Sequence, residues 1–242
     1  MPQFIRPTIN KFVLPPLAEF VVKLGDHALA FVYWRQKYFI DESQSDPISE
    51  IKGIVDGMCE NEKFADICAS GEAQSRMTKV NMLPGLVQMQ CSMMGAWGKA
   101  TKDGNLVQYR SLDFGGGPFA NNNILTVHHP TDSNNVFASV SWPGFVGAVT
   151  GFSEKISQSE KSAKPIYPHG TYKGLADAFV IRNMIQFADT PEDAVQMAKS
   201  VTRTWPVWIG IGDYNNQFIP MLYEDKVIEA FDEDSLAQLL SK

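Results

Sequence analysis

Cysteine, histidine and long apolar runs are all scarce in this sequence, and each scarcity removes a class of protein. The chain has only three cysteines, and an odd, small number argues against a scaffold built on disulfides. The four histidines are scattered, and there is no second close cysteine pair, so the ligand spacing of a zinc site is missing. We therefore expect no metal and no other cofactor.

Charge and hydropathy exclude further classes. No apolar run approaches the roughly 20 residues that span a bilayer, because charged residues such as Lys23 and Asp26 interrupt the most apolar stretches. Residues 1–12 lack the apolar core and cleavage site of a secretory signal. Lys and Arg total 21 against 27 Asp and Glu, a net charge of −6, which supplies no cationic field for a phosphate backbone. We expect neither a transmembrane segment nor a nucleic-acid partner.

The order of patterns along the chain predicts an α+β fold. Residues 16–75 repeat apolar side chains every three or four positions, as helices do, for example Ile51, Val55 and Met58. Residues 91–150 and 205–231 alternate short β-branched and aromatic runs with turn residues, which indicates antiparallel sheet. Two helices are predicted between these blocks, at 176–187 and from Thr190, a capping residue, to Val201. We expect the helices to cover faces of the sheet.

Two of the cysteines lie in the helical part. Cys59 and Cys68 are separated by eight residues. We predict that both are small buried side chains, with a disulfide between them as the alternative.

The third cysteine begins the stretch with the most suggestive chemistry. Cys91 is followed by Asp103-Gly104, a pair that favours a tight hairpin turn, and then by Arg110 and Asp113 on the returning strand. A thiol, a cation and a carboxylate would then lie near one another. Residues three apart point to opposite faces of a regular strand, so Arg110 and Asp113 converge on Cys91 only if the strand ends, twists or bulges near Ser111.

This stretch resembles a known family of enzymes. Cys91-Ser92, Trp97-Gly98, Thr101, Asp103-Gly104 and Arg110-Ser111-Leu112-Asp113 are similar to the opening of the N-terminal-nucleophile (Ntn) cysteine hydrolases. That group includes acid ceramidase, bile-salt hydrolase, penicillin V acylase and isopenicillin N acyltransferase, and the chain looks most like the acid-ceramidase-like proteins. Residues 80–86, 143–147 and 150–155 add weaker similarity. Ser111 stands where the family usually has Asn.

The resemblance implies an architecture and a substrate class. It implies an αββα sandwich in which residues 1–90 are a helical propeptide that stays attached as an α subunit, and residues 91–242 form the catalytic domain. Those 152 residues are few for such a domain, so we expect a C-terminal element of the family to be absent after Phe231. The implied substrate is a linear amide, of the N-acyl lipid or N-acyl amino acid type. Relatives are lysosomal or secreted.

The resemblance also implies roles for individual residues. The thiol of Cys91 would break the Gln90-Cys91 bond and so create a new α-amino group beside itself. Arg110 would stabilise the thiolate, and Asp113 would orient the amine. Arg182, Ser153 and Trp97 are candidates for contacts with the substrate or the oxyanion, although Ser153 replaces the Asn that the family uses.

Two other interpretations stay open. A papain-like cysteine protease also places Gln before its cysteine, but it begins a helix there, whereas Gly95, Gly98 and the Asp103-Gly104 turn favour strands. An inactive binding protein of the same fold would fit the two replacements of Asn by Ser. His169 could serve as a base in another mechanism, but we expect it to have a structural hydrogen bond instead.

Overall fold

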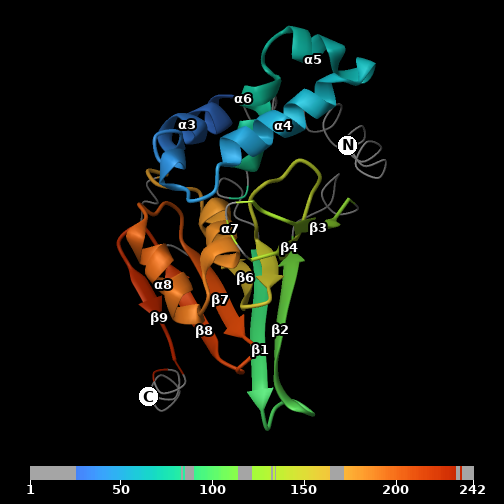
Figure 1. The fold of residues 1–242 in the computed structure, drawn as a ribbon. Coiled ribbons are helices and arrows are strands. Elements are labelled where there is room, and N and C mark those ends of the chain that lie inside the picture. The colour runs from blue at the N-terminus through green and yellow to red at the C-terminus, as the bar shows by residue number, and fades with distance from the viewer. Residues whose placement is uncertain are drawn as a thin grey trace.

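The fold combines a helical section with antiparallel sheets, as the sequence predicts. A computed structural model describes residues 26–82, 84, 90–113, 122–131, 133, 135–163, 172–232 and 235. Figure 1 shows the early helices gathered at one end, above the ends of the strands, with two later helices against the sheet. The protein is therefore α+β. The predicted helical residues before Asp26 lie outside the described ranges, as do Phe114 and His169.

The described part of the front section contains four α-helices and two short 3-10 helices. They are α3 (Asp26–Gln36), η1 (Ile40–Glu42), α4 (Pro47–Cys59), η2 (Glu62–Phe64), α5 (Ala65–Ala69) and α6 (Ala73–Asn81). Helix α4 begins where the Asp46 carboxylate accepts a hydrogen bond from the Ser49 amide, and Pro47 occupies its first turn. Its buried face includes Ile51, Val55 and Met58. The predicted periodicity is thus confirmed here.

A seven-stranded antiparallel sheet forms the centre of the molecule, with its strands side by side in chain order. They are β3 (Ile124–His128), β4 (Phe137–Ser141), β5 (Thr150–Ser153), β6 (Ile156–Ser162), β7 (Val207–Asp213), β8 (Phe218–Tyr223) and β9 (Ile228–Ala230). Every neighbouring pair is antiparallel. Such an order needs only short connections and hairpins, apart from the crossing between β6 and β7, which contains the two later helices.

The predicted hairpin at the third cysteine is confirmed and forms a separate sheet. Strand β1 (Gln90–Gly98) pairs with β2 (Gly104–Asp113), and the register is regular except for a shift between Ala96 and Gly98. The hairpin lies over β6 and β7. A Cβ added at Gly210 would come within 2.7 Å of the Met93 sulfur, and one at Gly212 within 2.5 Å of Leu106, so glycines on β7 permit this close approach.

Two helices cover the opposite face of the large sheet. They are α7 (Asp177–Phe187) and α8 (Pro191–Ser200), and α8 begins with the predicted Thr190 cap, completed by Asp193. Helix α7 packs on β5 and β6, and α8 packs on β7 and β8. The described residues thus form a helical layer, a seven-stranded layer and the hairpin. None of them adds a helix outside the hairpin, so the fourth layer of an αββα sandwich stays a prediction.

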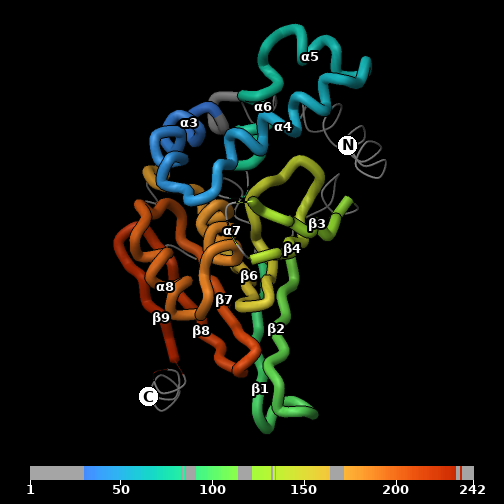
Figure 2. Tube along the Cα trace, viewed as in Figure 1, coloured from blue at the N-terminus to red at the C-terminus, as the bar shows by residue number. Residues whose placement is uncertain are grey.

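The front section and the sheets share one hydrophobic core. Ile51, Val55 and Met82 from the front pack in the same cluster as Phe179 and Ile181 of α7. Figure 2 follows the chain from the helical front section into the strands below it.

Polar contacts also tie the front section to the rest of the molecule. The Asn81 side chain accepts a hydrogen bond from the Val146 amide at 2.7 Å and donates to the Gly144 carbonyl. Asn183 of α7 accepts hydrogen bonds from Ser43 and Ser45. Residues before and after Cys91 are therefore held together by more than the peptide chain.

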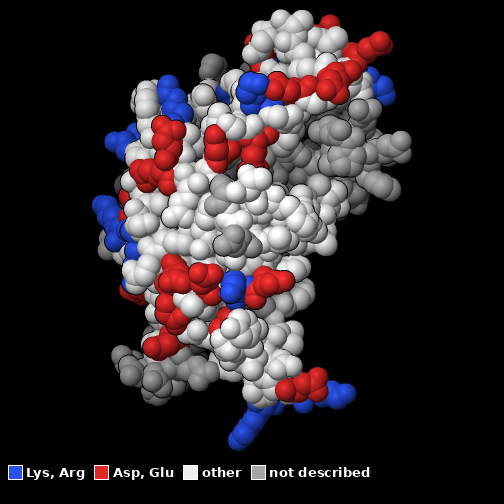
Figure 3. Space-filling model, viewed as in Figure 1, with Lys and Arg blue, Asp and Glu red and all other residues white. Residues whose placement is uncertain are grey.

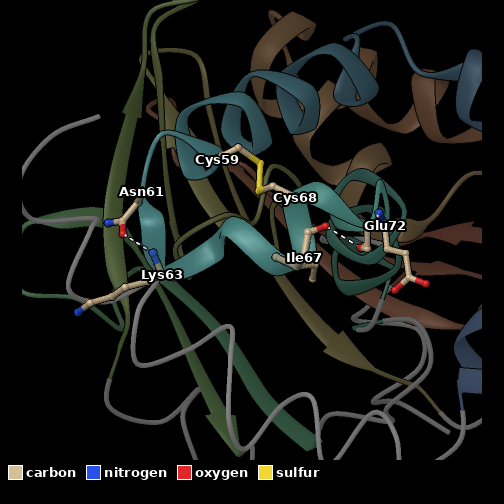
Figure 4. Close-up of a disulfide and its surroundings, with 7 residues drawn as sticks. Cys59, Asn61, Lys63, Ile67, Cys68 and Glu72 are labelled. Carbon is tan, nitrogen blue, oxygen red and sulfur yellow. Dashed lines mark hydrogen bonds between the residues drawn. A yellow bond between two sulfur atoms is a disulfide. The ribbon is translucent and has the colours of Figure 1, made fainter.

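One prediction about the cysteines was wrong. Cys59 and Cys68 are joined by a disulfide, and Cys91 is not part of one. Figure 4 shows the bond between the end of α4 and α5, across the turn that contains Asn61 and Lys63. In this turn, the side-chain oxygen of Asn61 accepts a hydrogen bond from the backbone amide of Lys63. The chain reverses between the two cysteines, so they are not neighbours on one continuous helix.

Two details of the sheet also differ from expectation. Residues 143–147, which resemble a glycine-rich strand, form a turn and irregular backbone instead. Strand β6 was not predicted, because its sequence, Ile-Ser-Gln-Ser-Glu-Lys-Ser, is polar.

Among the described residues, no helix combines the length and hydrophobicity needed to cross a membrane.

The disulfide should contribute measurably to stability. Replacing both Cys59 and Cys68 with Ala should lower the free energy of unfolding by about 2–3 kcal/mol, because the crosslink restricts a loop of about ten residues in the unfolded chain. Urea denaturation of the wild type and the double variant would measure this. Under reducing conditions the difference should shrink. Equal transition midpoints without reductant would contradict the prediction.

Candidate active site

The thiol of Cys91 lies at the start of β1, on the hairpin face that packs against the large sheet. Cys91 pairs with Leu112, and Met93 pairs with Arg110. Directly opposed residues in an antiparallel pair share a face, and so do alternate residues along a strand. Cys91 and Arg110 therefore point to the same side. The thiol is buried, with 8% of the residue exposed.

Arg110 holds the thiol and the large sheet together. Its Nη2 donates a hydrogen bond to Cys91 Sγ at 3.3 Å. Its Nε donates to the backbone carbonyl of Glu160, on β6, at 2.9 Å. One guanidinium group thus contacts both sheets, and its orientation toward the sulfur is fixed by a backbone atom.

The pKa of Cys91 reflects two opposing influences. Burial raises the pKa of the thiol above its ordinary value, while the positive charge and hydrogen bond of Arg110 lower it. The nearby Glu160 raises the pKa further when it is ionised. The burial effect is the larger, so the intact chain favours the thiol form, and Arg110 is the main group that favours the thiolate.

A buried cluster of acidic groups lies across the large sheet from the thiol. Glu160, Asp177 at the first position of α7, and Tyr223 of β8 are each at most 3% exposed. Within the described part of the chain, Glu160 Oε2, Asp177 Oδ1 and the Tyr223 hydroxyl have no hydrogen-bond partner. Burying polar groups in this way is unfavourable, which marks the cluster as a place where the protein sacrifices stability.

Burial also changes how these groups titrate. The pKa of Glu160 rises to about 8, first because it is buried and then because Asp177 is close. Burial raises the pKa of Asp177 to about 6, against hydrogen bonds from its own amide and that of Ala178. The pKa of Tyr223 is raised as well, again mainly by burial. Below about pH 6 both carboxyl groups hold a proton, and Arg110 then has no ionised acid behind it.

Asp113 occupies a different position from the other two residues of the predicted triad. It pairs with Gln90, and its carboxylate accepts a hydrogen bond from Ser111 at 3.2 Å. The register of β2 is regular there, so its side chain lies on the opposite face of the hairpin from those of Cys91 and Arg110. The structure brings Cys91 and Arg110 together, and it places Asp113 across from the Gln90-Cys91 peptide instead.

Trp97 and Ser153 lie away from the thiol. Trp97 packs against Phe218, with ring centroids 5.9 Å apart. It is six residues along β1 from Cys91, about 20 Å at the rise of a strand. The Ser153 hydroxyl accepts hydrogen bonds from the amides of Lys155 and Ile156, in the turn between β5 and β6. It closes that turn.

Arg182 is buried in α7 and contacts the front section. Its guanidinium donates to both oxygens of Glu50 and to the Val146 carbonyl, and Gln186 accepts from it as well. Only 3% of its side chain is exposed. No contact with Cys91 is seen among the described residues. Arg182 is therefore an interior arginine paired with an acid, Glu50.

An open cleft of about 500 Å³ lies beside Arg182, where β3 ends near the start of α4. His128 lines it, stacks on Phe137 and contacts the Ser139 hydroxyl at 3.3 Å. Burial and the charge of Arg182 lower the pKa of His128 to about 4, so this ring is neutral near pH 7. In the described ranges, no group of three or more His, Cys, Asp or Glu side chains could hold a metal ion.

The sequence analysis missed Glu160 and Asp177. Glu160 lies in the polar segment that was not recognised as a strand, and Asp177 looks like an ordinary acid at a helix N-terminus. The sequence gives one signal for Asp177, its position directly before the apolar run 178–181.

Comparisons with known proteins place the chain near two proteins of Dictyostelium discoideum. Protein dcd1B is 31% identical over 170 residues, covering 69% of this chain and 34% of its own length. Protein dcd1A is 30% identical over 199 residues, covering 77% of this chain and 42% of its own length. The match therefore spans less than half the length of either relative. No protein-family model matches the sequence.

Among solved structures, the chain has a distant match. The Caenorhabditis elegans N-acylethanolamine-hydrolyzing acid amidase (NAAA) ortholog matches 60% of this chain and 66% of its own, with a TM-score of 0.45 and 15% identity. At that distance the likeness carries no argument about the reaction of this chain. The functional case depends on the residues around Cys91.

The influence of Arg110 on the thiol can be measured directly. Because Cys91 is the one cysteine outside the disulfide, the thiolate absorbance of the folded protein reports on it alone. Replacing Arg110 with Gln should raise the pKa of Cys91, since the cation that favours the thiolate is lost. Arg110→Lys should raise it less.

Arg203 provides a matched control for that experiment. Its guanidinium binds only backbone carbonyls in the contacts described, those of Glu224, Asp225 and Lys199. Arg203→Gln should leave the titration of Cys91 unchanged. If Arg110→Gln gives the wild-type titration curve, the contact does not control the thiol.

The buried carboxyl groups should make stability depend on pH. The folded protein keeps a proton on Glu160 up to about pH 8, whereas the unfolded chain releases it near 4.5. The free energy of unfolding should therefore fall as pH rises between these values, by at most about 1.4 kcal/mol per pH unit for this group. Glu160→Gln, which mimics the protonated acid, should flatten the dependence above about pH 6, where the contribution of Asp177 ends.

Glu229 offers the control, because it is an exposed acid on β9. Denaturant unfolding of the wild type, Glu160→Gln and Glu229→Gln across this pH range would compare the slopes. Glu229→Gln should keep the wild-type slope. The same slope in Glu160→Gln would show that Glu160 is already ionised in the folded protein at neutral pH.

Proposed function

We propose that the protein is a self-processing cysteine amidohydrolase of the Ntn type, acting on linear amides. The observation that carries this proposal is the buried thiol of Cys91, 3.3 Å from the guanidinium of Arg110, at the start of a strand. A cation fixed beside a cysteine favours the nucleophilic thiolate. The motif around this pair, which resembles the Ntn cysteine hydrolases, points to the same reaction.

The first step in the proposal is cleavage before Cys91. The thiol attacks the carbonyl carbon of Gln90, the C–N bond breaks, and the acyl group passes to sulfur while the nitrogen gains a proton. Water then hydrolyses the thioester and leaves a free α-amino group on Cys91. Since an α-amine titrates near 8, it can accept the proton of the adjacent thiol at neutral pH.

The second step is hydrolysis of a substrate amide by the same residue. The α-amino group of Cys91 takes the thiol proton, and the sulfur attacks the carbonyl carbon of the substrate amide. The amide C–N bond then breaks, and the α-amino group passes the proton to the substrate amine, which leaves. Water then releases the acyl group. In this proposal Arg110 stabilises charge on the sulfur, and Asp113, which lies across from the Gln90-Cys91 peptide, orients the amine. The substrate class, an N-acyl lipid or N-acyl amino acid, follows from the family resemblance.

The protonation state of Glu160 affects the balance of charge at the thiol. When Glu160 is protonated, the charge of Arg110 acts on the sulfur alone. When Glu160 ionises, near pH 8, its negative charge opposes the thiolate. We therefore expect the catalytic form of the site to be favoured below that pH.

Residues 1–90 would remain bound after cleavage as a separate subunit. The ion pair of Glu50 with Arg182 supports this, as do the hydrogen bonds of Asn81 and Asn183 and the shared hydrophobic core. The disulfide between Cys59 and Cys68 supports a lysosomal or secreted location, since such bonds persist in oxidising compartments.

A binding protein without catalytic activity is the second candidate. The observation that favours it is the raised pKa of the buried Cys91, together with the side chain of Asp113 on the other face of the hairpin. Comparing self-cleavage and amide hydrolysis by the wild type and by Cys91→Ala separates the two candidates.

Self-cleavage and amide hydrolysis should both depend on Cys91. The purified wild type should yield fragments of 90 and 152 residues, the second beginning with Cys91, and should then hydrolyse N-acyl amides. Cys91→Ala should stay intact and inactive. Arg110→Gln should slow both reactions about 100-fold or more, as expected for loss of one group that stabilises the reacting charge. Mass spectrometry and a series of N-acyl amides of graded length would measure these outcomes.

Ser92 supplies a matched control, because it is the next residue on β1 and points to the exposed face. Ser92→Ala should cleave and hydrolyse like the wild type. Identical behaviour of the wild type and Cys91→Ala would retire the enzyme proposal in favour of a binding protein. An intact chain that hydrolyses substrate through Cys91 would support a papain-like enzyme.

A further inference from the structure

The backbone groups at the end of β6 point alternately to its two neighbouring strands. On the β7 side, the Ala163 amide donates a hydrogen bond to the Pro206 carbonyl at 3.2 Å. On the β5 side, the Glu160 amide donates to the Val149 carbonyl at 3.0 Å. Alternate residues of a strand direct their backbone groups to the same side, so the amide of Ser162 also points to the β5 side.

The chain that leads into β5 leaves this edge before it reaches Ser162. If the register of β5 and β6 continued, Gly147 would face Ser162. Instead, the Ala148 amide donates to the Ala178 carbonyl of α7 at 2.9 Å, and a Cβ added at Gly147 would come within 2.8 Å of the Ala178 side chain. Within the described part of the chain, the last residues of β6 therefore have no strand beside them on this edge.

The hairpin occupies the edge that β5 leaves open. The Glu160 carbonyl, which points to the same side as the Ser162 amide, accepts the hydrogen bond from Arg110 Nε at 2.9 Å. The sulfur of Cys91 accepts a hydrogen bond from the backbone amide of Ser162. It also accepts one from Arg110 Nη2, at 3.3 Å. Two N–H groups thus meet at one sulfur atom, one from the hairpin and one from the large sheet.

We propose that the backbone N–H of Ser162 is a catalytic group, which stabilises the thiolate of Cys91 together with Arg110. A hydrogen bond to the charged form of an acid favours that form, and the thiolate is the nucleophilic form of cysteine. The amide is held in place by the strand, so it needs no reorganisation when charge develops on the sulfur. The catalytic part of this proposal rests on the proposed function, whereas the effect on the thiol does not.

The two donors differ in how they respond to pH. The charge of Arg110 acts on a sulfur that also lies near Glu160, whose ionisation opposes the thiolate. Asp177 and Tyr223 lie behind Glu160 in the same buried cluster. The amide of Ser162 has no net charge and does not titrate, so its contribution persists whether or not these acids are ionised.

Exposed charges of the hairpin lie far from the sulfur. Figure 3 shows Lys and Asp side chains at the lower end of the molecule, where the hairpin turn lies in Figure 1. Cys91 is at the other end of β1. A change in the titration of the thiol therefore reports on the groups beside it.

An amide-to-ester replacement at Ser162 would test the proposal. Incorporating the α-hydroxy acid analogue of serine at this position converts the backbone N–H to an ester oxygen and keeps the side chain. The pKa of Cys91 should rise, so that about tenfold less thiolate is present at neutral pH, as expected for loss of one hydrogen bond to a charged atom. Thiolate absorbance would measure this without a substrate. Self-cleavage and amide hydrolysis should slow by a similar factor.

Ser159 offers a matched control on the same strand. Its amide points to β7, where Ser159 pairs with Gly210, so the same ester there removes a hydrogen bond between strands. This ester should lower the stability of the protein but leave the titration of Cys91 unchanged. Ser162→Ala, which keeps the N–H and removes the hydroxyl, should titrate and react like the wild type.

Ser162→Pro gives a second way to remove the same N–H. Proline lacks the donor, and this amide is not one that bonds to β7. The variant should match the Ser162 ester in its titration and its rates. Circular dichroism would show whether each variant is folded, and the ester, which changes the backbone less, decides the result if the proline variant is not.

Two results would overturn the proposal. One is a folded Ser162 ester in which Cys91 titrates as in the wild type. The other is an ester that slows both reactions while the titration stays the same, because Ser162 would then have only a structural role. If the wild type neither cleaves itself nor hydrolyses amides, but the ester still raises the pKa of Cys91, the proposed function fails and the role of Ser162 as a donor to the thiolate is supported.

Discussion

The contact of Arg110 with both Cys91 and the Glu160 carbonyl requires the hairpin to lie very close to the large sheet. Gly210 and Gly212 make that distance possible, since a Cβ at either would collide with side chains of the hairpin. Gln108 adds polar contacts across the same gap, donating to the Ser159 hydroxyl and the Gly210 carbonyl. The catalytic proposal therefore depends on the absence of side chains on one strand as much as on the presence of a thiol on another.

The same close packing explains the electrostatics of the site. Cys91 is buried, so neighbouring charges act on it more strongly than they would in water, whether they favour the thiolate, like Arg110, or oppose it, like Glu160. Behind the sheet, one oxygen of Glu160 and one of Asp177 are buried without a hydrogen-bond partner among the described residues. Groups that lower stability in this way are usually found where a protein needs a particular charge state.

Much of the architecture could be predicted from the sequence, and the failures have physical reasons. The hairpin, the Thr190 cap and the paired strands at the end of the chain depend on local turn and capping chemistry, which short segments encode. Strand β6 could not be recognised, because its polar side chains are satisfied or buried only by the hairpin and α7. The pairing of Cys59 with Cys68 depends on a reversal of the chain, and the side of the hairpin on which Asp113 lies depends on a register that stays regular to the strand end.

Helix α7 connects parts of the molecule that look independent. It begins with the buried Asp177, and one to two turns later it carries Arg182 and Asn183, which bind the front section. Asp177 lies five residues before Arg182, about 7.5 Å along the axis at 1.5 Å of rise per residue. A substitution that loosens the contacts of Arg182 or Asn183 with the front section would therefore act on the same short helix that positions the buried acid.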